Sequence, residues 1–263
     1  MDTGLKNKVA LVGGASKGLG KGCALQLAKE GANIIICARD GNKLHETADY
    51  ITKNTSVKVL PVPADLSKIK DISKLIDLSI REFGQIDVLV VNSGGPRAGK
   101  FADLTKEDWD DAYQSVFYYV VELYKRVIPQ MKSRQWGRII NIASLAVKEP
   151  AENLVLSNVF RSGVVSLAKT LSKELIEYNI TINNICPGAF KTERAAQLIA
   201  ERAKVTGESI QKIEEQAVNS FPLKRYQSPE ELGDLVVFLA SERAKGITGT
   251  TIQIDGGISK GLF

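Results

Sequence analysis

The sequence predicts an α/β protein with one doubly wound, parallel sheet of about seven strands, in a single domain that spans residues 1–263. Three observations lead to this fold class. Short apolar runs alternate with helical patterns along the whole chain. The runs are continuously apolar, which is typical of strands that are buried on both faces. No linker, repeat or low-complexity segment divides the 263 residues, a length that suits one α/β domain.

Each expected strand is a short apolar run, and a turn and a helical pattern follow most of them. The expected strands lie at 8–13, 33–38, 57–62, 87–91, 138–143, 181–186 and 250–254. The expected helices run from the glycine turn to 30, over 40–53, 67–83, 105–131, 153–178 and 193–216, and from 228 onward. Ser67, Thr105 and Ser228 are the expected N-caps, with Pro229 in the first turn of its helix. This rhythm predicts helices on both faces of the sheet.

The composition excludes several classes of function. The net charge is +5 and the cations are dispersed, so we expect no nucleic-acid partner. No run approaches the roughly 20 apolar residues of a membrane span, so we expect no membrane partner. The N-terminal residues have no apolar signal core, which predicts a cytoplasmic location.

Cysteine and histidine are both scarce. Cys23, Cys37 and Cys186 lie in separate apolar stretches, so we expect buried, reduced thiols. His45 is the only histidine and lies in a polar helix, where we expect a solvated side chain. We therefore expect no metal site and no Ser-His-Asp triad.

A glycine-rich turn follows the first strand directly. Residues 13–20 read Gly-Gly-Ala-Ser-Lys-Gly-Leu-Gly, and a helix comes next. A strand, a glycine turn and a helix N-terminus together present backbone N–H groups that attract a diphosphate, as in a Rossmann-like fold. The alternative is a turn with a structural role alone. The strand and helix on either side favour the nucleotide site.

The spacing Gly-x-x-x-Gly-x-Gly is one of several landmarks that occur in order along the chain. The others are Asp65-Leu66, Asn92-Ser93-Gly94-Gly95, Ser144, Pro187-Gly188 with Thr192, and Asp255-Gly256-Gly257. With these landmarks the chain resembles the short-chain dehydrogenase/reductase family, most closely its 3-oxoacyl-(acyl-carrier-protein) reductase branch. Two departures are mild: Gly13 stands where the family usually has Thr, and Ser93-Gly94 where it has Asn-Ala or Ala-Gly.

The resemblance implies a role for each landmark. Asp65 would hold the adenine amino group, and Asn92 and Gly94 would line the adenosine ribose and the diphosphate. Pro187, Gly188 and Thr192 would hold the nicotinamide side. The full set of expected cofactor-binding residues is Gly14, Ser16, Lys17, Gly18, Leu19, Gly20, Arg39, Asp65, Leu66, Asn92, Ser93, Gly94, Arg161, Pro187, Gly188 and Thr192.

Charge at the end of the second strand indicates which cofactor binds. An acidic residue there would favour NAD(H), because it accepts a hydrogen bond from the free ribose 2′-hydroxyl. This chain has Arg39 at that point, and Lys17 lies in the glycine turn. Two cations suit a 2′-phosphate, so we expect NADP(H), with NAD(H) as the alternative. Asp40 favours NAD(H), and the other interpretation of both cations is solvated surface charge.

The expected catalytic residues depart from the family. The resemblance implies Ser, Tyr and Lys, with a supporting Asn, and Ser144 matches the serine. The positions of the Tyr and Lys hold Ser157 and Arg161, in a register fixed by Ser162-Gly163. The Asn position holds Val116. Ser157 is a far weaker acid than tyrosine, and Arg161 stays protonated. Ser144, Ser157 and Arg161 are the candidate catalytic residues, and the alternative is that Ser157 and Arg161 are remnants.

Two functions follow from this pattern. The first is an NADP(H)-dependent oxidoreductase that interconverts a carbonyl and a hydroxyl group of a small molecule with an atypical active site. The second is a catalytically weak or inactive nucleotide-binding sensor or structural protein of the same fold. Arg97, Lys148, Glu149 and Glu152 are other candidates for proton transfer, or solvated loop residues, and Arg97 is also a candidate clamp for an anionic substrate.

Two further expectations concern the surface of the protein. The segment at about 192–216 is expected to cover the substrate, although its composition favours no particular ligand. The helices at 105–131 and 153–178 are apolar on more than one side, as Tyr118, Tyr119 and Val121 illustrate. A helix that is apolar all round must be buried all round, which predicts a homo-oligomer. The family resemblance implies a tetramer.

Overall fold

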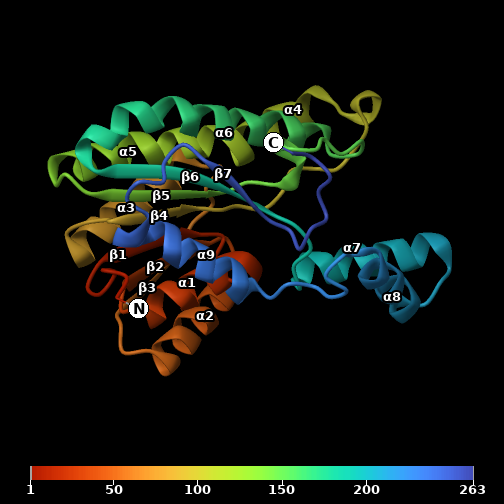
Figure 1. Ribbon diagram of the computed structural model, residues 1–263, viewed down its shortest axis with the longest axis horizontal. Helices are drawn as coiled ribbons and strands as arrows, with labels where there is room; N and C mark the ends of the chain where they lie inside the picture. Colours follow the sequence, from red (N-terminus) through yellow and green to blue (C-terminus); the bar gives the residue numbers. More distant parts are fainter. Residues whose placement is uncertain (1, 263) are drawn as a thin grey trace.

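A computed structural model describes residues 2–262 of the chain (Figure 1). Seven parallel strands form one sheet in the order β3-β2-β1-β4-β5-β6-β7, which confirms the predicted fold class. The strands are β1 (Val9–Gly13), β2 (Asn33–Ala38), β3 (Val59–Pro63), β4 (Val88–Val91), β5 (Gly137–Ile142), β6 (Ile180–Pro187) and β7 (Thr251–Ile254). Strand order reverses between β1 and β4, and such a point leaves a crevice at the carboxyl ends of the strands.

Helices cover both faces of the sheet (Figure 1). One layer contains α1 (Gly18–Lys29), α2 (Gly41–Asn54) and α9 (Pro229–Ala240). The other contains α3 (Ile69–Phe83), α5 (Tyr119–Ser133) and α6 (Val155–Leu175). Successive strand residues face opposite layers: Ile34 and Ile36 pack in the first core, and Ile35 packs in the second. Burial on both faces therefore explains the continuous apolar runs of the sequence.

The helix predicted over 105–131 contains one irregular turn. Thr105 begins α4 (Lys106–Ala112) with a capping box, as predicted. A π-helical turn then covers Tyr113–Tyr118 before α5 begins. The predicted helix over 193–216 is instead two helices, α7 (Glu193–Thr206) and α8 (Ile210–Ser220). The chain turns at Gly207, which has φ of +73°, and Ser209 caps α8.

The expectation that Ser67 caps a helix is wrong. Helix α3 begins at Ile69 after Lys68, and no side chain caps it. The Ser67 hydroxyl instead donates to Asp65 Oδ1 at 2.8 Å. Ser228 does cap α9, and Pro229 is in its first turn. A serine two residues from an aspartate has an alternative acceptor, which explains the difference between these two serines.

Helices α7 and α8 project from the body of the molecule (Figure 1). We call residues 193–220 the arm. Its base is closed by two backbone hydrogen bonds, from Lys191 N to Gln227 O at 2.8 Å and from Gln227 N to Ala189 O at 2.9 Å. Ala203 and Ile213 are buried within the arm. The arm thus has a small core of its own and leaves the body at one point.

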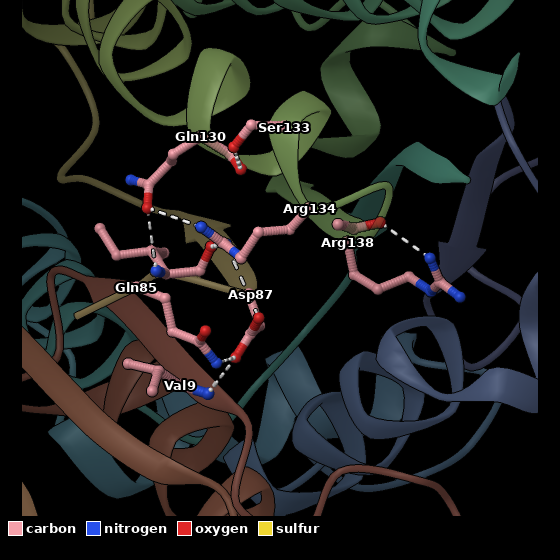
Figure 2. A network of polar contacts seen from close by, with 9 residues as sticks. Val9, Gln85, Asp87, Gln130, Ser133, Arg134 and Arg138 are labelled. Carbon is pink, nitrogen blue, oxygen red and sulfur yellow. Dashed lines mark hydrogen bonds and ion pairs between the residues drawn. The ribbon is translucent and has the colours of Figure 1, made fainter. Parts of the chain in front are cut away.

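A polar network joins the amino-terminal ends of β1 and β4 to the end of α5 (Figure 2). Asp87 is buried, and its Oδ2 accepts hydrogen bonds from Val9 N at 2.9 Å and from Gln85 Nε2 at 2.8 Å. Arg134 donates to Ile86 O at 2.8 Å and forms an ion pair with Asp87 at 3.7 Å. This network stabilises the sheet edge opposite the carboxyl ends of the strands.

Cys23, Cys37 and Cys186 are free and buried, as predicted. Burial raises the pKa of Cys23 and of Cys37 to about 12, so both thiols stay protonated at neutral pH. His45 is exposed on α2. Within residues 2–262, no helix has both the length and the apolar character that crossing a membrane requires.

Candidate functional site

The glycine turn lies at the carboxyl end of β1 and leads into α1. Gly14 and Gly18 have φ of +57° and +54°, which disfavours a side chain. A Cβ at Gly20 would lie 2.4 Å from Gly14 O, so the turn packs backbone against backbone. Lys17 occupies the N-cap of α1 and makes no side-chain capping bond. The N–H groups of the first turn of α1 are therefore left for a ligand, which fits a diphosphate.

Neighbouring segments hold the turn in place. Asn92 Nδ2 donates to Gly13 O at 3.0 Å, and Thr47 Oγ1 donates to Ser16 O at 3.0 Å. Ser93 Oγ donates to Ser115 O at 3.1 Å. Gly94 is exposed in the loop after β4. Asn92 and Ser93, which were both predicted to bind the cofactor, thus form bonds to the protein itself that hold the crevice in shape.

The side predicted for adenosine carries charge of both signs. Arg39 is exposed after β2, and Leu66 is buried close to Gly13. Partial burial would raise the pKa of Asp65, but two hydrogen bonds from Ser67 and the positive charges of Lys68 and Arg39 together hold the pKa below its usual value. Asp65 is therefore an anionic acceptor at neutral pH, as contact with an adenine amino group requires.

The side predicted for the nicotinamide lies between β6 and the arm. A Cβ at Gly188 would be 2.6 Å from Asp255 Cα, so only glycine fits there. Thr192 caps α7 by accepting from Ala195 N at 3.2 Å, and it lies across from Gly18. Leu19, Pro187, Gly188 and Thr192 line a cavity of about 400 Å³ together with residues of the arm and its base, namely Ala189, Phe190, Arg194, Ala195, Leu198, Ile199, Arg202, Ile213, Ala217 and Tyr226. The arm thus forms one wall of this cavity.

Arg161 lies close to the residue before Ser144. Its guanidinium Nη1 donates to Ile142 O at 3.0 Å and to Ala143 O at 3.3 Å, at the end of β5. Ser144 follows and accepts from Ala146 N at 3.1 Å. Ser157 lies one helical turn before Arg161 on α6 and is 7% exposed. Burial lowers the pKa of Arg161, but an arginine side chain keeps its proton at neutral pH.

A tyrosine near Arg161 was missed in the sequence analysis. Tyr119 is buried at the start of α5. Tyr119, Val116 and Arg161 line one small cavity together with Asn141. Burial raises the pKa of Tyr119, so its hydroxyl stays protonated. The signal in the sequence is a tyrosine three residues after Val116 in an apolar helix; this tyrosine was predicted to face an oligomer interface, and it is instead buried inside the subunit.

The loop residues proposed as alternative proton donors lie in varied surroundings. Arg97 forms an ion pair with Asp108 and donates to Asp103 O at 3.2 Å, so its charge is engaged at the start of α4. Lys148 is half-buried. Glu149 accepts from Lys260 N at 3.3 Å, and Glu152 is exposed. Arg97 is therefore poorly suited to clamp an anionic substrate in this arrangement.

A family model described as Enoyl-(Acyl carrier protein) reductase matches residues 14–259. The chain is 32% identical over 259 residues to the NADPH-dependent reductase BacG of Bacillus subtilis, which covers 98% of this chain and 100% of that protein. It is 31% identical over 254 residues to the 3-oxoacyl-(acyl-carrier-protein) reductase FabG of Staphylococcus epidermidis, which covers 96% and 99%. Solved structures extend this similarity to the fold. The L-sorbose reductase of Gluconobacter frateurii, in complex with NADPH and L-sorbose, has a TM-score of 0.95 and 33% identity, and both chains are covered in full, 100% each.

Proposed function

Because the chain belongs to the short-chain dehydrogenase/reductase family, we propose that it is an NADP(H)-dependent oxidoreductase that interconverts a carbonyl and a hydroxyl group of a small molecule. One observation carries the proposal: Arg161, one turn after Ser157, holds the carbonyl oxygens of Ile142 and Ala143 immediately before Ser144. Arg161 and Ser144 thereby come together at the end of β5, on the side of the sheet that also carries the glycine turn, and Ser157 lies one turn before Arg161 on α6. The names of the relatives support the reaction class.

The residues present fit the cofactor. The free N–H groups at the start of α1 would bind the diphosphate, and Gly14, Ser16, Gly18, Leu19 and Gly20 would form its floor. Lys17 and Arg39 would bind a 2′-phosphate, and Asp65 the adenine. NAD(H) remains the alternative cofactor, because Asp40 follows Arg39 directly.

The proposed active site works without the family tyrosine and lysine. Bound NADPH supplies the hydride. The Ser144 hydroxyl would donate to the substrate carbonyl oxygen, which polarises the carbonyl group. Arg161 donates to Ile142 and Ala143 through Nη1, so its other N–H groups would bind the ribose hydroxyls of the nicotinamide half. Ser157 lies on the same face of α6 and would pass a proton from solvent to the substrate oxygen, taking up a solvent proton as it gives up its own.

A second candidate function is a nucleotide-binding sensor with little or no turnover. Val116, Ser157 and Arg161 favour it, because all three replace residues that the family uses for proton transfer. The cofactor site would be kept in that case, since none of the three changes the glycine turn. The two functions differ in turnover and agree in cofactor binding.

The deciding experiment measures both properties on the same preparation. NADPH oxidation is followed over a panel of ketones, aldehydes and 3-oxoacyl thioesters, and calorimetry gives the NADPH dissociation constant. We expect turnover that is lost in Ser144→Ala, while the dissociation constant stays within twofold. The control is Ser73→Ala, which removes an exposed serine hydroxyl on α3 that donates to Ile69 O, within its own helix. Tight NADPH binding with no turnover on any substrate would support the sensor instead.

A further inference from the structure

A carboxylate of the arm lies between two lysines of the cofactor crevice. Glu193 Oε2 is 2.6 Å from Lys17 Nζ and 3.4 Å from Lys43 Nζ. Lys17 belongs to the glycine turn after β1, and Lys43 belongs to the first turn of α2, after β2. The hydrogen bond and charge of Lys17, together with those of Lys43, hold the pKa of Glu193 below its usual value. Three segments that are far apart in the sequence therefore share one charged contact.

The two lysines mark the adenosine side of the crevice. Lys43 N donates to Asp40 Oδ1 at 3.1 Å, and Asp40, which caps α2, is the neighbour of Arg39. Lys43 is thus held on the same helix start that follows Arg39, and Lys17 approaches from the glycine turn. An anion placed between the two lysines is attracted by positive charges from two different elements. The anion that lies between them in this structure is the side chain of Glu193.

We propose that Lys43 is a further cation of the 2′-phosphate site and that Glu193 is a built-in competitor of the 2′-phosphate for Lys17 and Lys43. This inference rests on the proposed NADP(H) function. A phosphate monoester carries about −1.5 to −2 charges at neutral pH, and a carboxylate carries one, so the phosphate attracts the lysines more strongly. The side chains of all three residues are 44–50% exposed, and such exposed pairs are weak enough to be displaced.

The competition couples cofactor binding to the arm. Glu193 is the first residue of α7 and directly follows Thr192, which caps that helix. While Glu193 binds the lysines, the start of the arm is tied to the crevice. When a 2′-phosphate takes the lysines, the carboxylate leaves them and the tie is released. NADH has no 2′-phosphate, so it leaves the tie largely in place.

The test is a set of dissociation constants measured by calorimetry for NADPH, NADH and 2′,5′-ADP. The proteins are wild type, Glu193→Gln, Lys43→Gln and the double variant, with Glu201→Gln as the control. Glu201 is an exposed acid on the same helix, so the control makes the same change in net charge away from the lysines. Each exposed ion pair changes a binding constant by up to about fivefold, and two pairs are involved. We therefore expect Glu193→Gln to tighten the binding of NADPH and of 2′,5′-ADP by about three- to tenfold. The binding of NADH should tighten by less than about twofold.

Lys43→Gln is expected to weaken the binding of NADPH by about two- to fivefold, with little effect on the binding of NADH. The gain in NADPH affinity from Glu193→Gln should be smaller when Lys43 is also replaced, because the two residues take part in one contact. The inference is overturned if Glu193→Gln leaves NADPH binding unchanged or weaker, or tightens NADH and NADPH equally, as a general charge effect would. If the wild type binds NADPH and shows turnover, but Glu193→Gln does not change NADPH binding, this inference is refuted and the proposed function stands. A wild-type protein that binds neither NADPH nor 2′,5′-ADP refutes the proposed function, and the inference with it.

Discussion

Ser157 and Arg161 are side chains whose chemistry differs most from what the family resemblance implies. A serine hydroxyl is shorter and far less acidic than a tyrosine hydroxyl. Arg161 keeps a positive charge beside the end of β5, where its Nη1 donates to Ile142 O and Ala143 O, and we expect it to keep a role in cofactor binding. Because Ser157 is less acidic than tyrosine while Arg161 keeps its charge, we expect proton transfer to be weakened more than cofactor binding.

Restoring the family pair should therefore raise turnover. General acid catalysis contributes about 10²–10⁴-fold, so Ser157→Tyr with Arg161→Lys is expected to speed reduction of a simple carbonyl compound by up to that factor. The NADPH dissociation constant should change little. The measurement compares turnover in wild type, both single variants and the double variant, because tyrosine beside Arg161 would have a differently placed cation as partner. If the wild type has high turnover and the double variant has lower turnover, Ser157 and Arg161 are themselves the catalytic residues.

Arg39 is the residue on which the choice of cofactor depends most directly. Its side chain is exposed after β2 and free to approach a 2′-phosphate. Loss of one charge-assisted contact costs about 1.5–3 kcal/mol, so Arg39→Ala should raise the NADPH dissociation constant at least tenfold. NADH affinity should stay within about twofold. Equal binding of NADPH and NADH by the wild type would contradict the assignment.

Among the elements, the strands were easier to predict than the breaks between helices. The run that forms β2 is short and continuously apolar, which favours a strand buried on both faces, and its residues do pack in two cores. The break at Gly207 had a signal in the sequence, a glycine followed by the cap Ser209, whereas the π-helical turn at Tyr113–Tyr118 depends on local packing, which hydrophobic spacing does not record. The same limit applies to the site. The glycine turn follows from adjacent residues, whereas the contact of Glu193 with Lys17 joins residues 176 positions apart.

The Asp87 network gives a prediction about how the elements are held together. Asp87→Asn removes the charge paired with Arg134 and places an amide where Val9 N and Gln85 Nε2 donate. Arg134 is 27% exposed, which reduces the cost of the broken pair, so we expect a loss of about 2–3 kcal/mol in the free energy of unfolding. Urea denaturation measures this loss. NADPH affinity should not change, because the network lies at the opposite sheet edge.

The matched control for that prediction is Asp77→Asn, a change at an exposed residue of α3. This variant should unfold within about 0.5 kcal/mol of the wild type. Equal stability of Asp87→Asn and Asp77→Asn would show that the network contributes nothing to the fold.

At the scale of the whole molecule, an aromatic cluster indicates an interface. A chain of ring–ring contacts, mostly edge-on or tilted, links six aromatic residues from the turn before α4, from α4, from the π-helical turn and from α6, namely Phe101, Trp109, Tyr113, Phe117, Tyr118 and Phe160. Phe101 is 73% exposed, and Val159 on α6 is 49% exposed. Apolar side chains that lie together at a surface are typical of protein–protein contacts. A homo-oligomer, which we expect to be a tetramer, would bury them.

Light scattering at micromolar concentration measures the oligomeric state. We expect a tetramer in the wild type and smaller species in Val159→Glu, because the introduced charge would have to be buried. Leu198→Glu changes an exposed leucine of the arm and should leave the mass unchanged. A clean wild-type monomer would refute the prediction.

The single point at which the arm leaves the body has a consequence for how this protein can diverge. Residues 193–220 form one continuous segment, and the backbone pairs between 189–191 and Gln227 join its two ends to the body. The segment supplies one wall of the 400 Å³ cavity but no strand of the sheet. Mutations can therefore accumulate in the arm and alter ligand preference while the sheet folds as before. The arm can therefore be altered independently of the sheet, so that selection for new substrates acts on it separately from selection for stability.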